Sequence, residues 1–253
     1  MISTSVWYYI PSKRDESVIR KRMREIAEVR VRYGFWRIFT LLRREGFTDN
    51  SKRVYRIYKN EGLNLRSKRP RRSRSSAHRL DRIELLGINQ SWSMDFVADQ
   101  LFDGRKFRAL TVVDNFSHKC LAIQAGQSLK GTDVVQVMNI VKDQRNAVPV
   151  RIQVDNGSEF ISKDLDRWAY DHGVVLDYSR PGKPTDNPYI ESFNGKFRDE
   201  CLNVHWFLSL EDAQTKIDLW REEYNSYRPH SSIDDLTPDQ FEEVYENKPE
   251  TLL

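Results

Sequence analysis

The stretch VRIQVDNGSEF, residues 150–160, decides the fold of this chain. Its first five residues alternate between aliphatic and polar side chains, which predicts a strand with one buried face. The strand ends in Asp155-Asn156-Gly157, a turn signal that also leaves a carboxylate at the end of the strand. A hairpin turn is enough to explain these three residues, but a carboxylate held on rigid backbone also suits a metal ion. Other residues must decide between the two interpretations.

The segments around this strand predict a mixed α/β sheet. Alternating patterns indicate strands over 91–99, 107–118, 119–126 and 174–179, and helical spacing indicates helices over 131–144, over 161–172 and from Tyr189 onward. Three strands in succession followed by alternating helix and strand are typical of a mixed sheet covered by helices. The spacing of Trp92, Trp168, Trp206 and Trp220 places them in the core, and His230 is interpreted as a packing residue.

The first 82 residues have a different character. Periodic apolar residues predict helices over 15–32, 35–45 and 51–61, closed by glycines and with an N-cap signal near Asn50. The last two helices flank a tight turn, so they could form a helix-turn-helix that presents Lys52, Arg53 and Arg56 to DNA. A small helical bundle with a solvated basic face is the alternative.

Charge supports the DNA-binding interpretation. Residues 1–82 hold 23 Lys and Arg against 8 Asp and Glu, a net charge of +15, whereas residues 83–253 carry a net charge of −11. A basic arm joined to an acidic domain is typical of proteins that bind nucleic acid. One proline and four serines prevent a stable helix over 66–82, so this stretch is predicted to be a basic linker lying along phosphates. Its candidate DNA contacts are Arg66, Lys68, Arg69, Arg71, Arg72 and Arg74.

Two further carboxylates join Asp155 as candidates for one site. Asp95 lies in the middle of an apolar strand, where an unpaired charge is costly. Glu191 lies beside an apolar helical stripe, although a Glu in a first turn can simply complement the helix dipole. Three carboxylates in one cleft repel one another unless a cation is present, and a pair of Mg²⁺ or Mn²⁺ ions would relieve that repulsion. The stripe consists of Ile190, Phe193, Phe197, Cys201 and Val204.

Two other acidic residues are weaker candidates. Asp114 ends the second strand, and a turn role explains it more simply. Glu159 follows Asp155 by four residues and is interpreted as a carboxylate at a helix start. Cys120 and Cys201 are too far apart in sequence, and lack His partners at metal spacing, to indicate a zinc site.

Four motifs occur in order: SMDF around Asp95, DNGSEF at 155–160, PGKPTDNPYIESFNGKFRDECLN at 181–203 and YNSYRPHSSIDDLTPDQF at 224–241. Thirty-five residues separate Asp155 from Glu191. Together these motifs resemble the integrase-core transposases of bacterial insertion sequences, specifically the second-frame product of the IS3 family. The resemblance implies a ribonuclease H-like five-stranded sheet and an Asp-Asp-Glu site of Asp95, Asp155 and Glu191 that holds two Mg²⁺ or Mn²⁺ ions. It also implies DNA contacts by Lys183 and Arg198.

The resemblance therefore predicts a transposase that cleaves the terminal inverted repeats of its element and joins them to target DNA. It also implies a homo-oligomer on DNA, and an upstream-frame product as fusion or partner. A catalytically inactive protein that only occupies element ends is the alternative, and a nuclease acting on RNA–DNA hybrids is a third. We expect a helical DNA-binding region over 1–64, a basic linker over 65–87, the catalytic core with its C-terminal helices over 88–246 and a tail over 247–253. No membrane span or signal peptide is evident, so the expected location is the bacterial cytoplasm, at the nucleoid.

Overall fold

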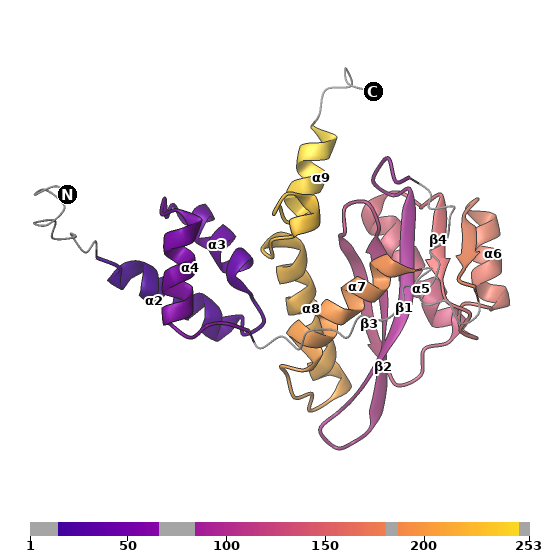
Figure 1. Cartoon of the computed structure of the whole chain (residues 1–253). Helices are drawn as coiled ribbons and strands as arrows, with labels where there is room; N and C mark the ends of the chain where they lie inside the picture. The colour runs from indigo at the N-terminus through magenta and orange to yellow at the C-terminus, as the bar shows by residue number, and fades with distance from the viewer. Residues whose placement is uncertain (1–14, 66–83, 181–186, 248–253) are drawn as a thin grey trace, which may run out of the picture. The chain divides into compact units, whose positions relative to one another are not determined.

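The chain divides into two compact units, Met1–Lys68 and Arg69–Leu253 (Figure 1). The structure, a computed structural model, describes residues 15–65, 84–180 and 187–247. None of the helices within these ranges is both long enough and apolar enough to cross a membrane.

The first unit contains the three helices that the sequence predicts: α2 (Ser17–Val29), α3 (Phe35–Arg44) and α4 (Ser51–Asn60). The side chain of Asn50 caps α4 by accepting a hydrogen bond of 2.9 Å from the backbone N–H of Arg53. The apolar faces of the three helices meet in a small core. Val18 and Val29 of the first helix lie outside this core and are exposed. The core consists of Ile19, Met23, Ile26, Tyr33, Ile38, Leu41, Leu42, Val54, Ile57 and Tyr58.

The second unit is built on a mixed sheet of five strands, as the sequence predicts. The strands lie in the order β3-β2-β1-β4-β5. The β1–β2 and β2–β3 pairs are antiparallel, and the β1–β4 and β4–β5 pairs are parallel. The strand bounds are β1 Ser91–Gln100, β2 Lys106–Asp114, β3 Cys120–Gly126, β4 Arg151–Val154 and β5 Val175–Tyr178.

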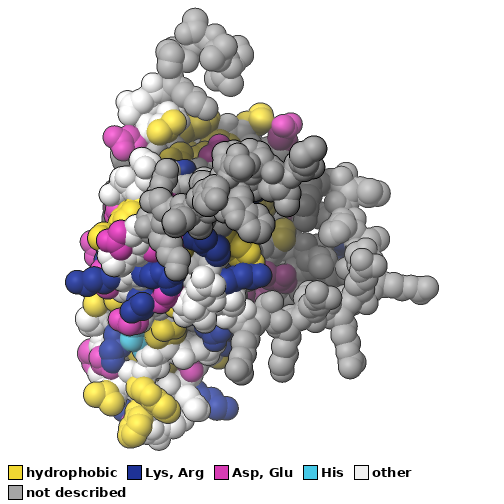
Figure 2. All heavy atoms as spheres, turned by 60° about the vertical axis from the view of Figure 1, so that its left-hand side comes forward, with side chains coloured by type: hydrophobic (Ala, Val, Ile, Leu, Met, Phe, Trp, Pro, Cys, Tyr) yellow, Lys and Arg dark blue, Asp and Glu magenta, His cyan; other side chains and the backbone are white. Residues whose placement is uncertain are grey.

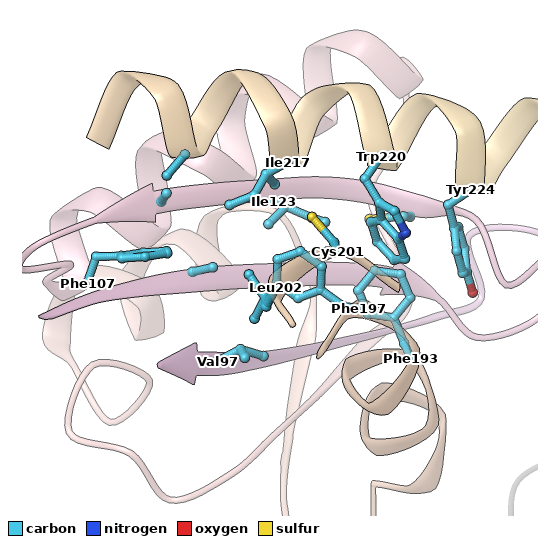
Figure 3. Close-up of a cluster of buried hydrophobic side chains, with 14 of the residues drawn as sticks. Val97, Phe107, Ile123, Phe193, Phe197, Cys201, Leu202, Ile217, Trp220 and Tyr224 are labelled. Carbon is cyan, nitrogen blue, oxygen red and sulfur yellow. The ribbon is translucent and has the colours of Figure 1, made fainter. Parts of the chain in front are cut away.

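Helices cover both faces of this sheet (Figure 1). One face packs against α5 (Gly131–Arg145) and α6 (Lys163–Asp171). The other packs against α7 (Pro188–Phe197) and α8 (Leu210–Ser226). Figure 3 shows this second layer, in which aromatic and aliphatic side chains of α7 and α8 meet those of the strands. The last helix, α9 (Pro238–Glu246), contacts α8.

The alternation in β1 assigns its residues to the two layers. Trp92 and Met94 are buried against α5 and α6. Val97 is buried in the opposite layer, with α7 and α8. Because successive side chains of a strand point to opposite faces, Asp95 shares the face of Val97. The central strand therefore presents a carboxylate toward α7.

The helix that begins with α7 changes its winding at its end. Residues Arg198–Leu202 form a π-helical turn, η2, which holds more residues per turn than an α-helix. Cys201 stays buried, but Leu202 becomes buried as well and Val204 is exposed. The predicted stripe was therefore wrong at Val204, because it assumed a constant α-helical period. Trp206 beyond this turn is 75% exposed, so its core assignment was also wrong, whereas the other three predicted core tryptophans are buried.

Candidate active site

Strand register brings Asp95 and Asp155 to the same level of the sheet. The parallel strands β1 and β4 pair up to Ser93 and Gln153. Each Asp lies two residues beyond this last pair, so both carboxylates lie on the same side of the sheet on strands about 4.8 Å apart. Burial raises the pKa of Asp95, and the negative charge of Asp155 raises it further, as expected for two neighbouring carboxylates.

Both carboxylate oxygens of the half-buried Asp95 accept hydrogen bonds. The backbone N–H of Phe96 donates to Oδ1 at 2.7 Å, and Asn194 Nδ2 donates to Oδ2 at 2.7 Å. Burial nevertheless dominates and raises the pKa of Asp95 above its ordinary value, and the charge of Asp155 adds to this. The hydrogen bonds and the nearby Arg198 oppose the rise. The metal-free site therefore disfavours the charge on this carboxylate.

The turn after β4 holds the exposed Asp155 in place. The N–H of Gly157 donates to Asp155 Oδ1 at 2.9 Å, and Asn156 Nδ2 donates to the carbonyl of Ser179 at 2.6 Å. A Cβ on Gly157 would lie 3.0 Å from Asp155 Oδ1, so only glycine leaves this carboxylate undisturbed. The Asp-Asn-Gly turn that the sequence predicts is therefore also what holds the Asp155 carboxylate in place.

The rest of this loop is anchored to the sheet. Glu159 is paired with Arg108 of β2, and that ion pair lowers the pKa of the Glu159 carboxyl. The guanidinium of Arg108 lies 4.1 Å from the ring centre of Phe96, and Phe96 stacks on Phe160 at 5.1 Å. The carboxylate of Glu159 therefore pairs with Arg108 and ties the loop after β4 to strand β2.

Glu191 lies in the first turn of α7 and is exposed. The preceding residues Asn187 and Pro188 start the helix, and Asn187 Nδ2 donates to the carbonyl of Gln153 in β4 at 3.4 Å. Partial burial, and then the charge of Asp95, raise the pKa of Glu191. Asp95 therefore interacts electrostatically with both of the other predicted carboxylates.

A basic residue, Arg198, follows directly after the end of α7. Arg198 begins the π-helical turn, and its Nη1 donates to the carbonyl of Ala98 in β1 at 3.4 Å. Its charge lowers the pKa of Asp95, so it faces the same region. This position next to the carboxylates suits a contact with a phosphate.

The donor set suits a hard divalent cation such as Mg²⁺, because it consists of carboxylate oxygens whose mutual repulsion a cation would relieve. Within residues 15–65, 84–180 and 187–247, no three His, Cys, Asp or Glu side chains are already close enough to hold a metal ion. A cation would therefore have to draw the carboxylates together.

Two residues of the site were not predicted from the sequence. Asn194 and Thr111 lie against Asp95, the first from α7 and the second from β2. The signal for Asn194 was a polar residue four positions after Ile190, inside an otherwise apolar helical stripe. Nothing in the sequence marks Thr111, because only the register of β1 and β2 makes it the partner of Asp95.

The turn interpretation of Asp114 is confirmed. Its buried carboxylate accepts hydrogen bonds from the backbone N–H groups of Asn89, Phe116 and Ser117 at 2.7 to 2.9 Å. The packing interpretation of His230 is confirmed as well, since it is 2% exposed and its ring contacts Tyr224.

The described candidate DNA-binding residues of the first unit all lie on α4. Arg53 is ion-paired with Asp49 at 2.8 Å and with Glu16 at 3.6 Å, and Arg56 is also paired with Glu16. Lys52 is exposed. Basic and acidic side chains are likewise interspersed on the face that Figure 2 shows. The remaining candidates lie outside the described residues: Arg66, Lys68, Arg69, Arg71, Arg72, Arg74 and Lys183.

Family models match both units. A model described as an HTH-like domain matches residues 13–72, and two models described as an integrase core domain match residues 87–184 and 172–238. The fold agrees with that of an experimental structure of the simian T-cell lymphotropic virus intasome in complex with the PP2A regulatory subunit B56 gamma. That likeness has a TM-score of 0.53 at 14% identity and covers 92% of this chain and 76% of the other. The sheet and these matches define an integrase-core polynucleotidyl transferase with an HTH-like domain.

Sequence relatives make the assignment more specific. The chain is 42% identical over 242 residues to an insertion element IS407 protein of Burkholderia multivorans, covering 95% of this chain and 86% of that one. It is 25% identical over 264 residues to the transposase InsF for insertion sequence IS3A of Escherichia coli, covering 95% and 90%. The chain belongs to the integrase-core transposases of bacterial insertion sequences, in the IS3 family.

Proposed function

We propose that this transposase cleaves the ends of an insertion sequence and joins them to target DNA, with Asp95, Asp155 and Glu191 as its catalytic, metal-holding carboxylates. The observation that carries this assignment is the parallel register of β1 and β4, from which Asp95 and Asp155 follow at the same level. The electrostatic contact of Asp95 with Glu191 supports the third position.

We propose two Mg²⁺ or Mn²⁺ ions per site. Bound divalent ions would activate the attacking oxygen and stabilise the leaving one. The protein supplies the hard oxygen ligands and holds them on three different elements, two of them fixed by the sheet. Burial, and then the repulsion between the carboxylates, raises the pKa values of Asp95 and Glu191, and a bound cation would offset both effects.

The reaction consists of two phosphoryl transfers. Water first attacks the phosphorus at the element's 3′ end, the phosphorus–O3′ bond breaks, and a free 3′-hydroxyl remains. That hydroxyl then attacks a target phosphodiester, a new phosphorus–oxygen bond forms, and the target's own 3′-oxygen leaves. One bond forms for each that breaks, so no external energy source is needed. Arg198, on the same side of the sheet as Asp95, is positioned for a phosphate oxygen of the reacting end.

The HTH-like unit is proposed to bind the terminal inverted repeats. Its basic helix α4 would exchange the carboxylate partners of Arg53 and Arg56 for DNA phosphates, and Lys52 would join them. The basic residues of 66–74 would extend this contact along the DNA backbone. Because two ends must be held together for joining, a homo-oligomer on DNA is part of the proposal, as is an upstream-frame product as fusion or partner.

The test is strand cleavage and strand transfer by the full chain on labelled DNA that carries the element's inverted repeats. Asp95→Asn, Asp155→Asn and Glu191→Gln should each abolish both reactions in Mg²⁺ and leave DNA binding unchanged. Asp143→Asn is the matched control, because Asp143 is an exposed carboxylate at the end of α5 with a side chain 76% exposed. Full activity of Glu191→Gln in Mg²⁺ would remove Glu191 from the site.

A further inference from the structure

Two polar side chains are buried where α7 meets the sheet, beside the hydrophobic cluster of that layer. Asn194 is 7% exposed and lies between Phe193 and Phe197, which belong to the hydrophobic cluster. Thr111 is fully buried on β2, directly opposite Asp95 in the strand pairing. Burying an amide and a hydroxyl costs free energy unless each forms hydrogen bonds, so their partners indicate what they do.

The hydrogen bonds of these residues lead to the carboxylate of Asp95. Asn194 Nδ2 donates to Asp95 Oδ2 at 2.7 Å, and Asn194 Oδ1 accepts from the hydroxyl of Thr111 at 3.0 Å. The same hydroxyl lies 3.1 Å from the backbone carbonyl of Asp95. A short polar chain therefore runs from β2 through α7 to the central strand.

Thr111 determines which way the amide of Asn194 points. An amide can present either its oxygen or its NH₂ group to a neighbour, and only the NH₂ group is compatible with a carboxylate. The one hydrogen of the Thr111 hydroxyl can reach the Asn194 amide oxygen at 3.0 Å or the Asp95 carbonyl at 3.1 Å, and its bond to the amide holds the amide oxygen on the far side. Without this donor, the buried amide oxygen would lose its partner and the amide could rotate.

We propose that Asn194 and Thr111 are positioning residues for the transposition reaction: they fix the Asp95 carboxylate in its metal-binding orientation and tie it to the helix that carries Glu191. This inference rests on the proposed function, because it requires Asp95 to be a metal ligand. Asn194 and Glu191 lie within one turn of α7, so the bond to Asp95 also holds the start of that helix against β1.

The geometry leaves the carboxylate able to bind a cation. Each oxygen of Asp95 accepts one protein hydrogen bond, from Phe96 N–H or from Asn194, and each oxygen can accept a second contact. Two donors of fixed direction therefore stop the carboxylate from rotating without using up its binding capacity. Groups that orient a metal ligand in this way typically change metal affinity or activity about 10–100-fold when they are replaced.

The variants that test this are nearly isosteric. Asn194→Leu removes the donor to Asp95, and Thr111→Val removes only the hydroxyl. Asn225→Leu is the matched control, because Asn225 is a buried Asn of α8 in contact with the same face of the sheet, and its amide bonds to the backbone N–H and carbonyl of Cys120. Mn²⁺ affinity is measured by electron paramagnetic resonance on the full chain, beside strand cleavage and the melting temperature.

Asn194→Leu should weaken Mn²⁺ binding about 10–100-fold. Thr111→Val should weaken it in the same direction by a smaller factor, and the double variant should be no weaker than Asn194→Leu, since Thr111 acts through Asn194. Asn225→Leu should lower the melting temperature and leave the Mn²⁺ affinity unchanged. If Asn194→Leu fails to fold, Thr111→Val and the control decide the question between them.

Wild-type Mn²⁺ affinity in Thr111→Val and Asn194→Leu would overturn the inference. An equal loss of affinity in Asn225→Leu would overturn it as well, because packing alone would then explain the effect. Asp95→Asn separates this failure from that of the proposed function. If Asp95→Asn itself binds Mn²⁺ normally and cleaves DNA, the site assignment is wrong. If Asp95→Asn loses both Mn²⁺ binding and DNA cleavage while Asn194→Leu keeps both, only the positioning role of Asn194 is wrong.

Discussion

Divalent metal should stabilise the second unit against heat, and Glu191→Gln should remove most of that effect. In the metal-free protein, burial and mutual repulsion raise the pKa values of Asp95 and Glu191, so the folded state disfavours their charges at neutral pH. A cation that binds the folded site and not the unfolded chain reverses this penalty. At a concentration 100 times its dissociation constant it contributes about 2.7 kcal/mol.

The size of the unit converts this free energy into temperature. For a unit such as Arg69–Leu253, each kcal/mol corresponds to roughly 2–4 °C, so saturating Mn²⁺ should raise its melting temperature by about 5–11 °C. Glu191→Gln removes a repelling charge from an exposed side chain that is screened by solvent. Its metal-free form should therefore melt at or slightly above the wild-type temperature, by less than about 1 kcal/mol in stability.

The assay is differential scanning calorimetry of the full chain with and without Mn²⁺, at pH 7.5 and pH 5. A carboxyl whose folded pKa is raised stabilises the protein below its unfolded pKa, and that stability is lost as pH rises through the folded value. Protons therefore compete with the metal, and the metal-induced shift should be smaller at pH 5 than at pH 7.5. The reasoning is refuted if Mn²⁺ at a concentration that supports cleavage leaves the melting temperature unchanged, or if Glu191→Gln and Asp155→Asn both show the wild-type shift.

Three further predictions concern other parts of the same unit. Burial lowers the pKa of His230 to about 2, so stability present above the ordinary value of 6.5 is lost as pH falls: about 2 kcal/mol should disappear by pH 5, and urea unfolding of His230→Gln should lack this loss. Glu200→Gln removes the carboxylate that is paired at 2.7 Å with Arg228, whose side chain is 3% exposed. The free energy of unfolding should fall by about 3 kcal/mol in urea unfolding, and a fall of less than about 1 kcal/mol would contradict the role of the pair. Gly157→Ala should displace the Asp155 carboxylate and slow strand cleavage by roughly tenfold in kinetic assays, with no change in melting temperature. An unchanged rate of cleavage would mean that the turn does not orient Asp155.

Local patterns in the sequence were sufficient for most of the elements. The helices of the first unit and the strands around Asp95 and Asp155 follow from periodicity and turn residues, which act over a few neighbouring positions. The Asp-Asn-Gly turn is one such local signal, and the structure adds that Gly157 N–H holds the carboxylate. The three predicted carboxylates were singled out by their places in the predicted strands and helix, and the four motifs grouped them into one site.

The sequence failed where one element's geometry changes or depends on another element. Val204 was misassigned because the helix passes into a π-helical turn and ends at Leu202, so Val204 lies beyond the helix in a turn. Nothing in the sequence indicated that Arg53 and Arg56 form ion pairs with Glu16, which comes from a preceding segment of the chain. These contacts join residues whose separation in sequence carries no signal.

The sequence by itself determined that the chain has a basic helical arm, a mixed sheet and a set of carboxylates with the spacing of an integrase core. Only the tertiary structure decided what surrounds those carboxylates: Asn194 bonds to Asp95 and to Thr111, and the Arg108–Glu159 ion pair anchors the loop that follows Asp155. The physical reason is that turns and helices are specified by neighbouring residues, whereas strand register and helix docking are specified by the whole core. A hydrogen bond between α7 and β1 exists only after that core has formed.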